Sequence, residues 1–407
     1  MKILIVVEKF IPEIGSAAHV YYDLAKAFIK KSHEVDVITS YPREFNLSKM
    51  DVGKEFPLNE TIDGIKIHRC KHPAQRDNVI LRGLEHFVLP RYYFKTYRKL
   101  GKKFDVCLMY IPPLPLYYLA RKIKKYDGTK SVLNFQDFHP QELTDVGVLK
   151  NPLVIKILKY IEKKAYKNAD FITVLSKQGI DYVKERGGHK DRIAHIYNGV
   201  IVEDFDKFKV EGCRNGRISK DKKTVVTYAG ILSPYQGIGN ILDAAKYLKK
   251  HKDIVFYIVG DGSVKQHLQG RIDSEDITNV RLLPFKPREE YFNIIKESNI
   301  LLVSLDERMK APCFPGKIKD LLGIGRPIIA SVPIDSETAY VTREADCGTV
   351  IEPGNIDGFT KAILKLKNDA KLRKEMGWNG RLFLEEHMNV EKNVKHYVTI
   401  FEKLMAQ

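Results

Sequence analysis

Short apolar runs alternate with helix-like patterns from the beginning of the chain. Residues 2–7 carry a continuous apolar run, and 16–31 repeats apolar residues at the spacing of an amphipathic helix. Residues 33–39 follow as a second predicted strand. Continuous runs of this length are typical of parallel strands that are buried on both faces. The opening of the chain therefore predicts a β-α-β unit.

The same alternation continues in two series, separated by a stretch without periodicity at 203–222. The predicted strands are 65–69, 105–110, 131–135 and 169–176 in the first series, and 224–228, 254–259, 279–287 with its loop, 299–304, 327–331 and 348–351 in the second. With 407 residues and 44% apolar content, the chain is long enough for two full cores. We therefore expect an α/β protein with one domain at 1–205 and a second at 206–387.

The charge of the chain is its unusual property. The formal net charge is +17, of which +11 lies in 1–205 and +6 in 206–407. Such an excess suits nucleic acid, an anionic membrane surface or acidic small substrates, and composition does not choose among them. The five cysteines form no Cys-x-x-Cys pair, which argues against a disulfide framework and a zinc site and favours a reducing cytosol.

A basic and aromatic segment, 87–104, contributes to this excess. It holds six Lys or Arg residues and no acidic residue, interleaved with aromatic and aliphatic side chains. A helix of this composition can lie on an anionic membrane surface. It can equally pack its aromatic side in a core and leave a solvated basic face. Both interpretations stay open from the sequence, and no apolar window is long enough for a membrane-spanning helix.

The most informative stretch is 312–330, which places Lys317 at the start of a short helix after Pro315 and Gly316. The helix dipole and an ammonium would there point at the same spot, which suits an anion such as a diphosphate. Asp320 shares the helix face with Lys317 and can reach hydroxyls beside that anion. The competing interpretation is an exposed i,i+3 pair worth about 0.2–0.5 kcal/mol.

Two positions after strands of the first domain are further candidates. Gly15 lies where a strand ends and a helix starts, the usual ligand position of an open α/β sheet, although a plain turn glycine fits as well. Asp137 follows the strand 131–135, where a helix N-cap or a turn residue is the simpler interpretation. His139 stands beside it as a lone histidine.

The segment Pro-Gly-Lys-Ile-Lys-Asp-Leu-Leu-Gly-Ile-Gly-Arg-Pro at 315–327 resembles the nucleotide-sugar loop of family 4 glycosyltransferases. The Tyr-Ala-Gly and Gln-Gly ends of 228–237 and the Gln-Asp-Phe-His-Pro segment at 136–140 resemble one branch, the N-acetyl-L-fucosamine transferases of surface polysaccharide synthesis. The resemblance covers nearly the whole chain. It implies the GT-B fold, in which two Rossmann-like domains face each other across a deep cleft and a terminal helix, here 388–407, crosses back to the first domain.

The resemblance also implies roles for individual residues. Asp137 and Lys317 would be catalytic, and His19 and His139 would bind the acceptor. The donor would be bound by Gly15, Gly230, Gln236, Gly237, Asp261, Phe285, Lys286, Glu307, Gly316, Lys317 and Asp320. The chain departs from the family pattern where Ile231 and Gln236 replace two loop cations and where Pro312 replaces the first of two glutamates.

The function implied is retaining transfer of a sugar, such as an N-acetylated amino sugar, from a UDP-linked donor to a glycan or lipid-linked acceptor. The donor is a substrate, so no cofactor is expected, and Lys317 with the loop 230–237 would stabilise the leaving diphosphate without a metal. We expect a cytoplasmic protein, peripheral on the inner face of the membrane. A nucleotide-sugar epimerase of the same fold and a basic nucleic-acid-binding protein are the alternatives.

Overall fold

The computed structural model describes residues 1–406 apart from 44–46, 48–50, 74–78 and 209–222. The chain forms two compact units: unit 1 comprises Met1–Thr144, Leu149–Val200 and Val390–Gln407, and unit 2 comprises Asp145–Val148 and Ile201–Asn389. The division thus falls after Val200 rather than after residue 205. Phe205 explains the difference, because its ring packs against Phe292 of unit 2 with centroids 5.4 Å apart. Most of the expected linker, 209–222, lies outside the described residues.

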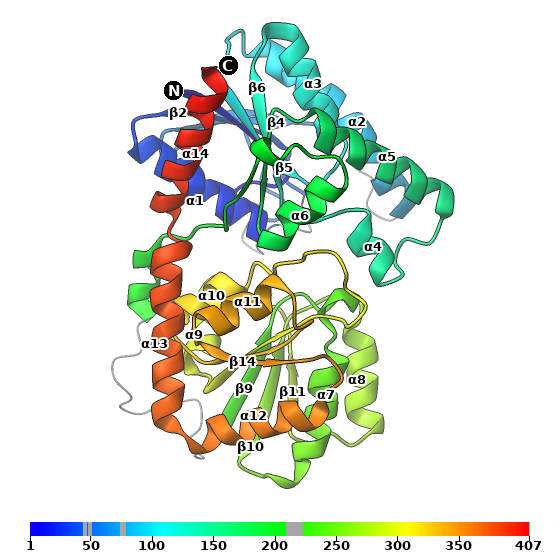
Figure 1. Ribbon diagram of the computed structural model, residues 1–407, viewed down its shortest axis with the longest axis vertical. Helices are drawn as coiled ribbons and strands as arrows, with labels where there is room; N and C mark the ends of the chain where they lie inside the picture. Colours follow the sequence, from blue (N-terminus) through cyan, green and yellow to red (C-terminus); the bar gives the residue numbers. More distant parts are fainter. Residues whose placement is uncertain (44–46, 48–50, 74–78, 209–222, 407) are drawn as a thin grey trace. The chain divides into compact units, whose positions relative to one another are not determined.

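Unit 1 contains a twisted sheet with helices on its faces (Figure 1). The order of its described strands is β3 (Asn59–Ile62), β4 (Ile65–Cys70), β2 (Glu34–Ser40), β1 (Lys2–Val6), β5 (Val106–Ile111), β6 (Lys130–Phe135), β7 (Phe171–Val174) and β8 (Ile193–His195). Its helices are α1 (Ser16–Lys30), α2 (Val79–Lys99), α3 (Leu116–Asp127), α4 (Gln141–Asp145), α5 (Pro152–Asn168), α6 (Lys177–Glu185) and α14 (Val390–Met405). All neighbouring strands run parallel except β3 and β4.

The last helix of the chain, α14, belongs to unit 1 and lies beside α1 (Figure 1). The ring of Phe401 stacks on Phe28 with centroids 5.8 Å apart, and both side chains are buried. Asn134 of β6 donates a hydrogen bond of 3.0 Å to the hydroxyl of Tyr397. The C-terminal segment therefore completes the core of the unit that the N-terminal segment begins.

Unit 2 is a second parallel α/β sheet. Its described strands follow the order β11 (Val280–Leu283), β10 (Ile254–Val259), β9 (Thr224–Ala229), β12 (Ile300–Ser304), β13 (Ile328–Ser331) and β14 (Gly348–Ile351). The helices are α7 (Gly239–Tyr247), α8 (Lys265–Ser274), α9 (Arg288–Glu297), α10 (Ile318–Ile324), α11 (Glu337–Glu344), α12 (Ile356–Asn368) and α13 (Ala370–His387). Two parallel-sheet domains confirm the predicted α/β fold class.

Helix α10 contains one glycine, Gly323, and is followed by a second, Gly325. The helix continues to Ile324, and Gly325 ends it in the left-handed conformation with φ 71°. Gly323 instead serves packing, because a Cβ at this position would lie 2.5 Å from the ring of Phe205. Glycine is therefore needed at position 323 because the ring of Phe205 leaves no room for a side chain. It is not needed there to end the helix.

Helix α2 contains most of the basic segment 87–104. Leu89, Tyr93 and Tyr97 are buried, at spacings of one helical turn, and Phe87 is the aromatic residue that stays exposed. Arg91 and Lys95 point to solvent. The aromatic side of this helix thus packs inside unit 1, and membrane contact through 87–104 stays a prediction that rests on its basic face alone.

Two further properties concern the chain as a whole. Within the described ranges, no helix is both long and apolar enough to cross a bilayer. The cysteines that the structure describes, Cys70, Cys107, Cys313 and Cys347, are all free thiols. Cys213 lies outside the described residues.

Candidate functional site

Lys317 lies at the N-terminus of α10, directly before Ile318, and its side chain turns into unit 2. Its Nζ atom stands 3.7 Å from the centre of the Tyr228 ring, and a Cβ added to Gly230 would come within 2.8 Å of it. Tyr228 and Gly230 stand at the carboxyl end of β9. The carboxyl ends of parallel strands are where open α/β sheets bind ligands.

The amine of Lys317 is inaccessible to water and has no hydrogen-bond partner in the part of the chain that the structure describes. Burial lowers the pKa of this amine to about 7. Among the described residues, the face of the Tyr228 ring stabilises its charge, with an electrostatic contribution from Cys313. A buried ammonium without a hydrogen-bonded partner is costly, and an anion with several oxygens would satisfy it.

The loop after β9 is shaped by glycines and by the hydroxyl of Tyr228. Gly230 has φ 152° and Gly237 is left-handed with φ 51°, conformations that side chains disfavour. The Tyr228 hydroxyl lies 3.0 Å from both the carbonyl oxygen of Ile231 and Oε1 of Gln236. Gln236, which replaces a family cation, therefore holds the loop against the strand through Tyr228.

Asp320 lies one helical turn after Lys317 and is mostly buried, with 18% of its side chain exposed. Tyr291 of α9 donates to it over 3.4 Å, and the amine of Lys319 stands 3.5 Å away. Its carboxylate therefore stays fixed on the helix. The exposed i,i+3 pair between Lys317 and Asp320 is not formed, since Lys317 turns inward.

The other predicted donor residues of unit 2 follow the ends of neighbouring strands. Asp261 after β10 is paired with Lys265 at 3.0 Å, and this hydrogen bond lowers the pKa of its carboxyl. Lys286 after β11 is paired with Glu290 at 2.9 Å, while Phe285 is exposed. Glu307 after β12 is exposed. Asp261 and Lys286 are thus paired within their own segments and the other two side chains are exposed, so the donor-binding roles of all four stay predictions.

In unit 1, polar side chains gather after the carboxyl ends of β1, β5 and β6. Burial raises the pKa of Asp137 and lowers that of His139, and each feels the charge of the other. Tyr110, near the end of β5, has its pKa raised well above the ordinary value by burial, with further contributions from Asp137 and Glu8. The structure thus places Asp137, Glu8 and Glu142 within electrostatic reach of one hydroxyl.

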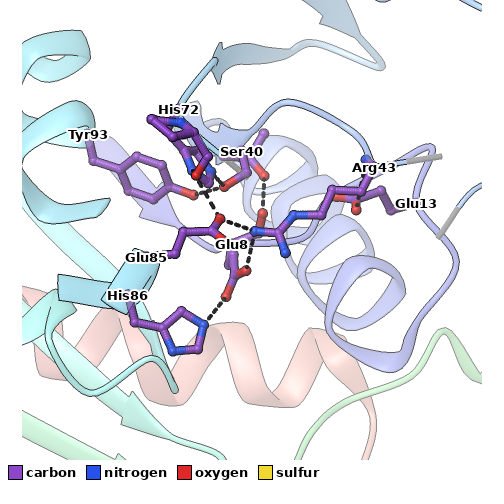
Figure 2. Close-up of polar contacts among 10 residues, drawn as sticks. Glu8, Glu13, Ser40, Arg43, His72, Glu85, His86 and Tyr93 are labelled. Carbon is purple, nitrogen blue, oxygen red and sulfur yellow. Dashed lines mark hydrogen bonds and ion pairs between the residues drawn. The ribbon is translucent and has the colours of Figure 1, made fainter. Parts of the chain in front are cut away.

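Glu8 belongs to a network of buried charges that the sequence did not reveal (Figure 2). Arg43 lies between Glu8, at 3.2 Å, and Glu85, which it also contacts. His86 points its Nε2 at the other oxygen of Glu8 from 3.9 Å. The guanidinium therefore connects the loop after β1 with helix α2 and leaves one oxygen of Glu8 directed at a half-exposed imidazole.

A second set of contacts extends this network through Ser40, His72 and Tyr93. The hydroxyl of Ser40 stands 2.8 Å from Nε2 of His72 and 2.7 Å from the hydroxyl of Tyr93 (Figure 2). His72 in turn lies 3.1 Å from Glu85. Burial lowers the pKa values of His72 and His86, which favours their neutral forms. Carboxylates, neutral imidazoles and hydroxyls in such a cluster are suited to hydrogen-bonding the hydroxyls of a polar ligand.

The remaining predicted residues of unit 1 lie at the start of α1. Gly15 occupies the N-cap position with no side-chain cap, and the N–H of His19 donates to its carbonyl over 3.3 Å. The side chain of His19 is half-buried. Glu142, one residue later than the family glutamate, accepts a hydrogen bond of 2.8 Å from the N–H of Phe138 and is buried. It therefore holds the loop that carries Asp137 and His139.

Across the described ranges, no group of three or more His, Cys, Asp or Glu side chains could hold a metal ion. The Asp-x-Asp pair at 204–206 does not form such a site either, because Arg381 binds Asp206 at 2.9 Å. The expected metal independence remains a hypothesis about the reaction.

Two family models match the chain, one on each side of the 200–212 stretch. The Glycosyl transferase 4-like domain matches residues 15–199, and Glycosyl transferases group 1 matches 213–383. The first range includes Asp137 and also Arg43 and His86, which contact Glu8. The second range includes Lys317 and the loop after β9.

Known proteins with similar sequences or folds carry related names. The chain is 20% identical over 390 residues, 92% of its length and 95% of the relative, to the putative colanic acid biosynthesis glycosyl transferase WcaI of Escherichia coli (strain K12). It is 32% identical over 209 residues, 50% of its length and 52% of the relative, to the UDP-Gal:alpha-D-GlcNAc-diphosphoundecaprenol alpha-1,3-galactosyltransferase of Escherichia coli. Anabaena Alr3699/HepE in complex with UDP shares its fold, with a TM-score of 0.72, 15% identity and coverage of 99% and 100% of the two chains.

Proposed function

Since the chain belongs to the GT-B glycosyltransferases, with a glycosyl transferase 4-like domain followed by a group 1 domain, we propose that it is a retaining, metal-independent transferase. Its donor is a UDP-linked sugar bound by unit 2, and its acceptor is a glycan or lipid-linked glycan bound by unit 1. The observation that supports this most directly is the buried, unpartnered amine of Lys317 beside the glycine loop. A diphosphate supplies the negative oxygens that this amine lacks.

In this proposal, different residues of unit 2 bind different parts of the donor. Lys317 and the backbone N–H groups of the loop 230–237 bind the diphosphate, and Asp320 accepts from the ribose hydroxyls. When the bond between the anomeric carbon and the phosphate oxygen breaks, negative charge grows on the diphosphate. Lys317 stabilises that charge in a site without bulk water, where the interaction is strongest.

The new glycosidic bond forms on the face from which the diphosphate leaves. The acceptor hydroxyl gives its proton to the departing phosphate oxygen, so atoms and charge balance without a protein base. Asp137 and His139 orient the acceptor and the sugar, and His19 and Gly15 contribute from the start of α1. The raised pKa of Asp137 suits a group that donates or shares a hydrogen bond with a hydroxyl.

The nature of the two substrates is supported by the names of relatives. WcaI is named for colanic acid biosynthesis, and the galactosyltransferase is named for a UDP-sugar donor and a diphosphoundecaprenol-linked acceptor. We extend these classes to this chain, with an N-acetylated amino sugar as the preferred donor and surface polysaccharide synthesis as the setting.

Titration calorimetry with UDP tests the donor site. We expect Lys317→Met to weaken UDP binding by about 100-fold, the effect of removing a buried charged hydrogen bond. Lys361→Met, on the exposed face of α12, is the matched control and should bind like the wild type. Equal affinity of the two variants for UDP would contradict the proposed site.

The pH dependence of UDP binding is a second test of the role of the Lys317 amine. The free amine has a pKa of about 7, and a neighbouring diphosphate favours its charged form. Binding therefore takes up a proton above pH 7, and the affinity should fall about tenfold for each further pH unit in the wild type. The Lys317→Met variant should show no such slope.

Incubation of the enzyme with a panel of UDP-sugars, with and without a lipid-linked glycan acceptor, separates the reactions. Release of UDP only in the presence of acceptor supports a transferase. A new sugar nucleotide formed without acceptor would instead identify an epimerase. Steeply salt-dependent binding of DNA or RNA, with no UDP binding, would favour the nucleic-acid alternative.

A further inference from the structure

Helix α5 in unit 1 exposes a stripe of large apolar side chains. Leu153, Ile157 and Tyr160 follow one another at spacings of four and three residues, so they share one face of the helix. Their exposed fractions are 65%, 45% and 58%. Single exposed apolar residues are ordinary, but a contiguous stripe of this kind marks a contact surface.

The stripe is held in a formed helix rather than in a frayed end. Asn151 caps α5, and its side chain accepts hydrogen bonds of 3.0 and 3.2 Å from the N–H groups of Leu153 and Val154. Further along the same helix, Ile161 and Ala165 are buried in unit 1, so α5 is anchored there while its first turns stay exposed. The first turns of α5 therefore present their apolar side chains in a fixed arrangement.

Lysines surround the stripe. They are Lys150, Lys156, Lys159, Lys163, Lys164 and Lys167, and all but the half-buried Lys164 are exposed. The amine of Lys164 lies 4.5 Å from the centre of the Tyr160 ring. Between Asp145 and Asp170, Glu162 is the single acidic residue.

Glu162 offers no charge to the surface. Its side chain is buried, it accepts hydrogen bonds of 3.0 and 3.3 Å from Tyr166 and Tyr182, and burial raises its pKa to about 7. The surface of α5 is therefore apolar in its centre and purely basic around it. A second copy of the same surface would bring lysines against lysines, which disfavours self-association.

We infer that the stripe formed by Leu153, Ile157 and Tyr160, with the lysines around it, docks unit 1 on an anionic lipid bilayer. The apolar side chains enter the boundary between head groups and acyl chains, and the lysines extend to the lipid phosphates. Helix α2 is a weaker candidate, because the aromatic side chains at Tyr93 and Tyr97 are buried. The inference concerns membrane attachment and does not depend on the transferase chemistry.

Co-sedimentation of the full chain with vesicles tests the inference in the absence of any sugar nucleotide. We expect binding to equimolar phosphatidylcholine and phosphatidylglycerol, weakened by salt, and much weaker binding to phosphatidylcholine alone. The triple variant Lys156→Gln, Lys159→Gln, Lys163→Gln should lose about 100-fold in affinity, about fivefold for each lysine. The double variant Leu153→Ser, Ile157→Ser should lose on the order of tenfold for each side chain.

Two matched variants serve as controls. Lys95→Gln, Arg98→Gln, Lys99→Gln removes the same charge from the exposed face of α2, and Ile334→Ser, Tyr247→Ser removes exposed apolar side chains from unit 2. Both should bind vesicles like the wild type. The inference is wrong if the α2 variant loses vesicle binding while the α5 variants keep it. It is also wrong if the wild type does not bind anionic vesicles.

A fluorescent reporter keeps the test independent of variant stability. The chain holds one tryptophan, Trp378, which is 62% exposed. In a Trp378→Phe background, Tyr160→Trp places a single reporter in the stripe. Its emission should shift to the blue on addition of anionic vesicles, and an unchanged spectrum would show that the stripe stays in water.

Discussion

The side chain of Lys317 lowers the stability of the free protein but favours the binding of an anionic ligand. Its amine is buried against Tyr228 with no hydrogen-bond partner among the described residues, so the free protein bears the cost of a desolvated charge. Active sites commonly hold such unsatisfied groups, because the ligand supplies the missing contacts. The same logic explains Gly230, since any larger residue there would occupy the space of the amine.

We predict that Lys317→Met stabilises the free protein by about 1 to 3 kcal/mol, because methionine fills the site without a buried charge. The fold lowers the pKa of the amine from 10.5 to about 7, so the charged amine is disfavoured in the folded state. The gain should therefore be complete below pH 7 and should decrease as the pH rises towards 10.5. Urea denaturation of the free protein across this range measures it.

The control for this prediction is Lys361→Met, which replaces an exposed lysine on α12. Its free energy of unfolding should stay within about 0.5 kcal/mol of the wild type at each pH. A destabilised Lys317→Met variant would mean that the lysine stem, rather than the charge, dominates the packing beside Tyr228.

At the scale of elements, Arg43 couples the loop after β1 to helix α2. Its side chain is 13% exposed, between Glu8 at 15% and Glu85 at 4% (Figure 2). Removing one partner from a mostly buried group of charges leaves carboxylates without compensation. The arginine therefore determines where Glu8 and His86 stand.

We predict that Arg43→Met lowers the free energy of unfolding by about 3 kcal/mol. Adding Glu85→Gln to this variant should recover part of the loss, because the uncompensated carboxylate is then absent. Denaturation followed by far-ultraviolet circular dichroism measures both variants, with Arg91→Met on the exposed side of α2 as control. A loss no larger than that of Arg91→Met would show that water already reaches the Glu8 and Glu85 carboxylates.

The elements that carry most of the fold were predictable because both faces of their strands are buried. The runs behind β1, β9 and β12 match the structure to within a residue. Strand β3 was not predicted, since it is a short edge strand in which no residue is buried, and β8 has three half-buried residues. Periodicity detects a strand through burial, so these two short strands escape it, although the edge strand β14 was predicted.

The candidate site was predictable only where a local pattern carries it. Lys317 and Asp320 stand in one short segment with glycines and prolines around them. Tyr228 reads as an ordinary core residue of a strand, and its contact with Lys317 depends on tertiary packing. Glu8, Arg43 and Glu85 come from three separate segments that meet only because the carboxyl ends of β1 and β2 are adjacent. The spacing of these three residues in the sequence therefore gives no indication that their side chains lie close together.

At the scale of the molecule, each unit carries its own core and its own group of polar residues. Unit 1 is closed by the C-terminal helix α14, whose Phe401 is fully buried against Phe28. Unit 2 contains Trp378, the single tryptophan of the chain, in α13. Tryptophan fluorescence therefore reports on unit 2, while circular dichroism reports on both units.

We predict that Phe401→Ala destabilises unit 1 by about 3 to 5 kcal/mol, because it leaves a cavity against α1. In urea, the circular dichroism transition should then begin at a lower concentration than the fluorescence transition. The matched variant Leu366→Ala, at a buried position of α12, should instead move the fluorescence transition. Coincident shifts of both signals in both variants would show that the two units unfold as one cooperative body.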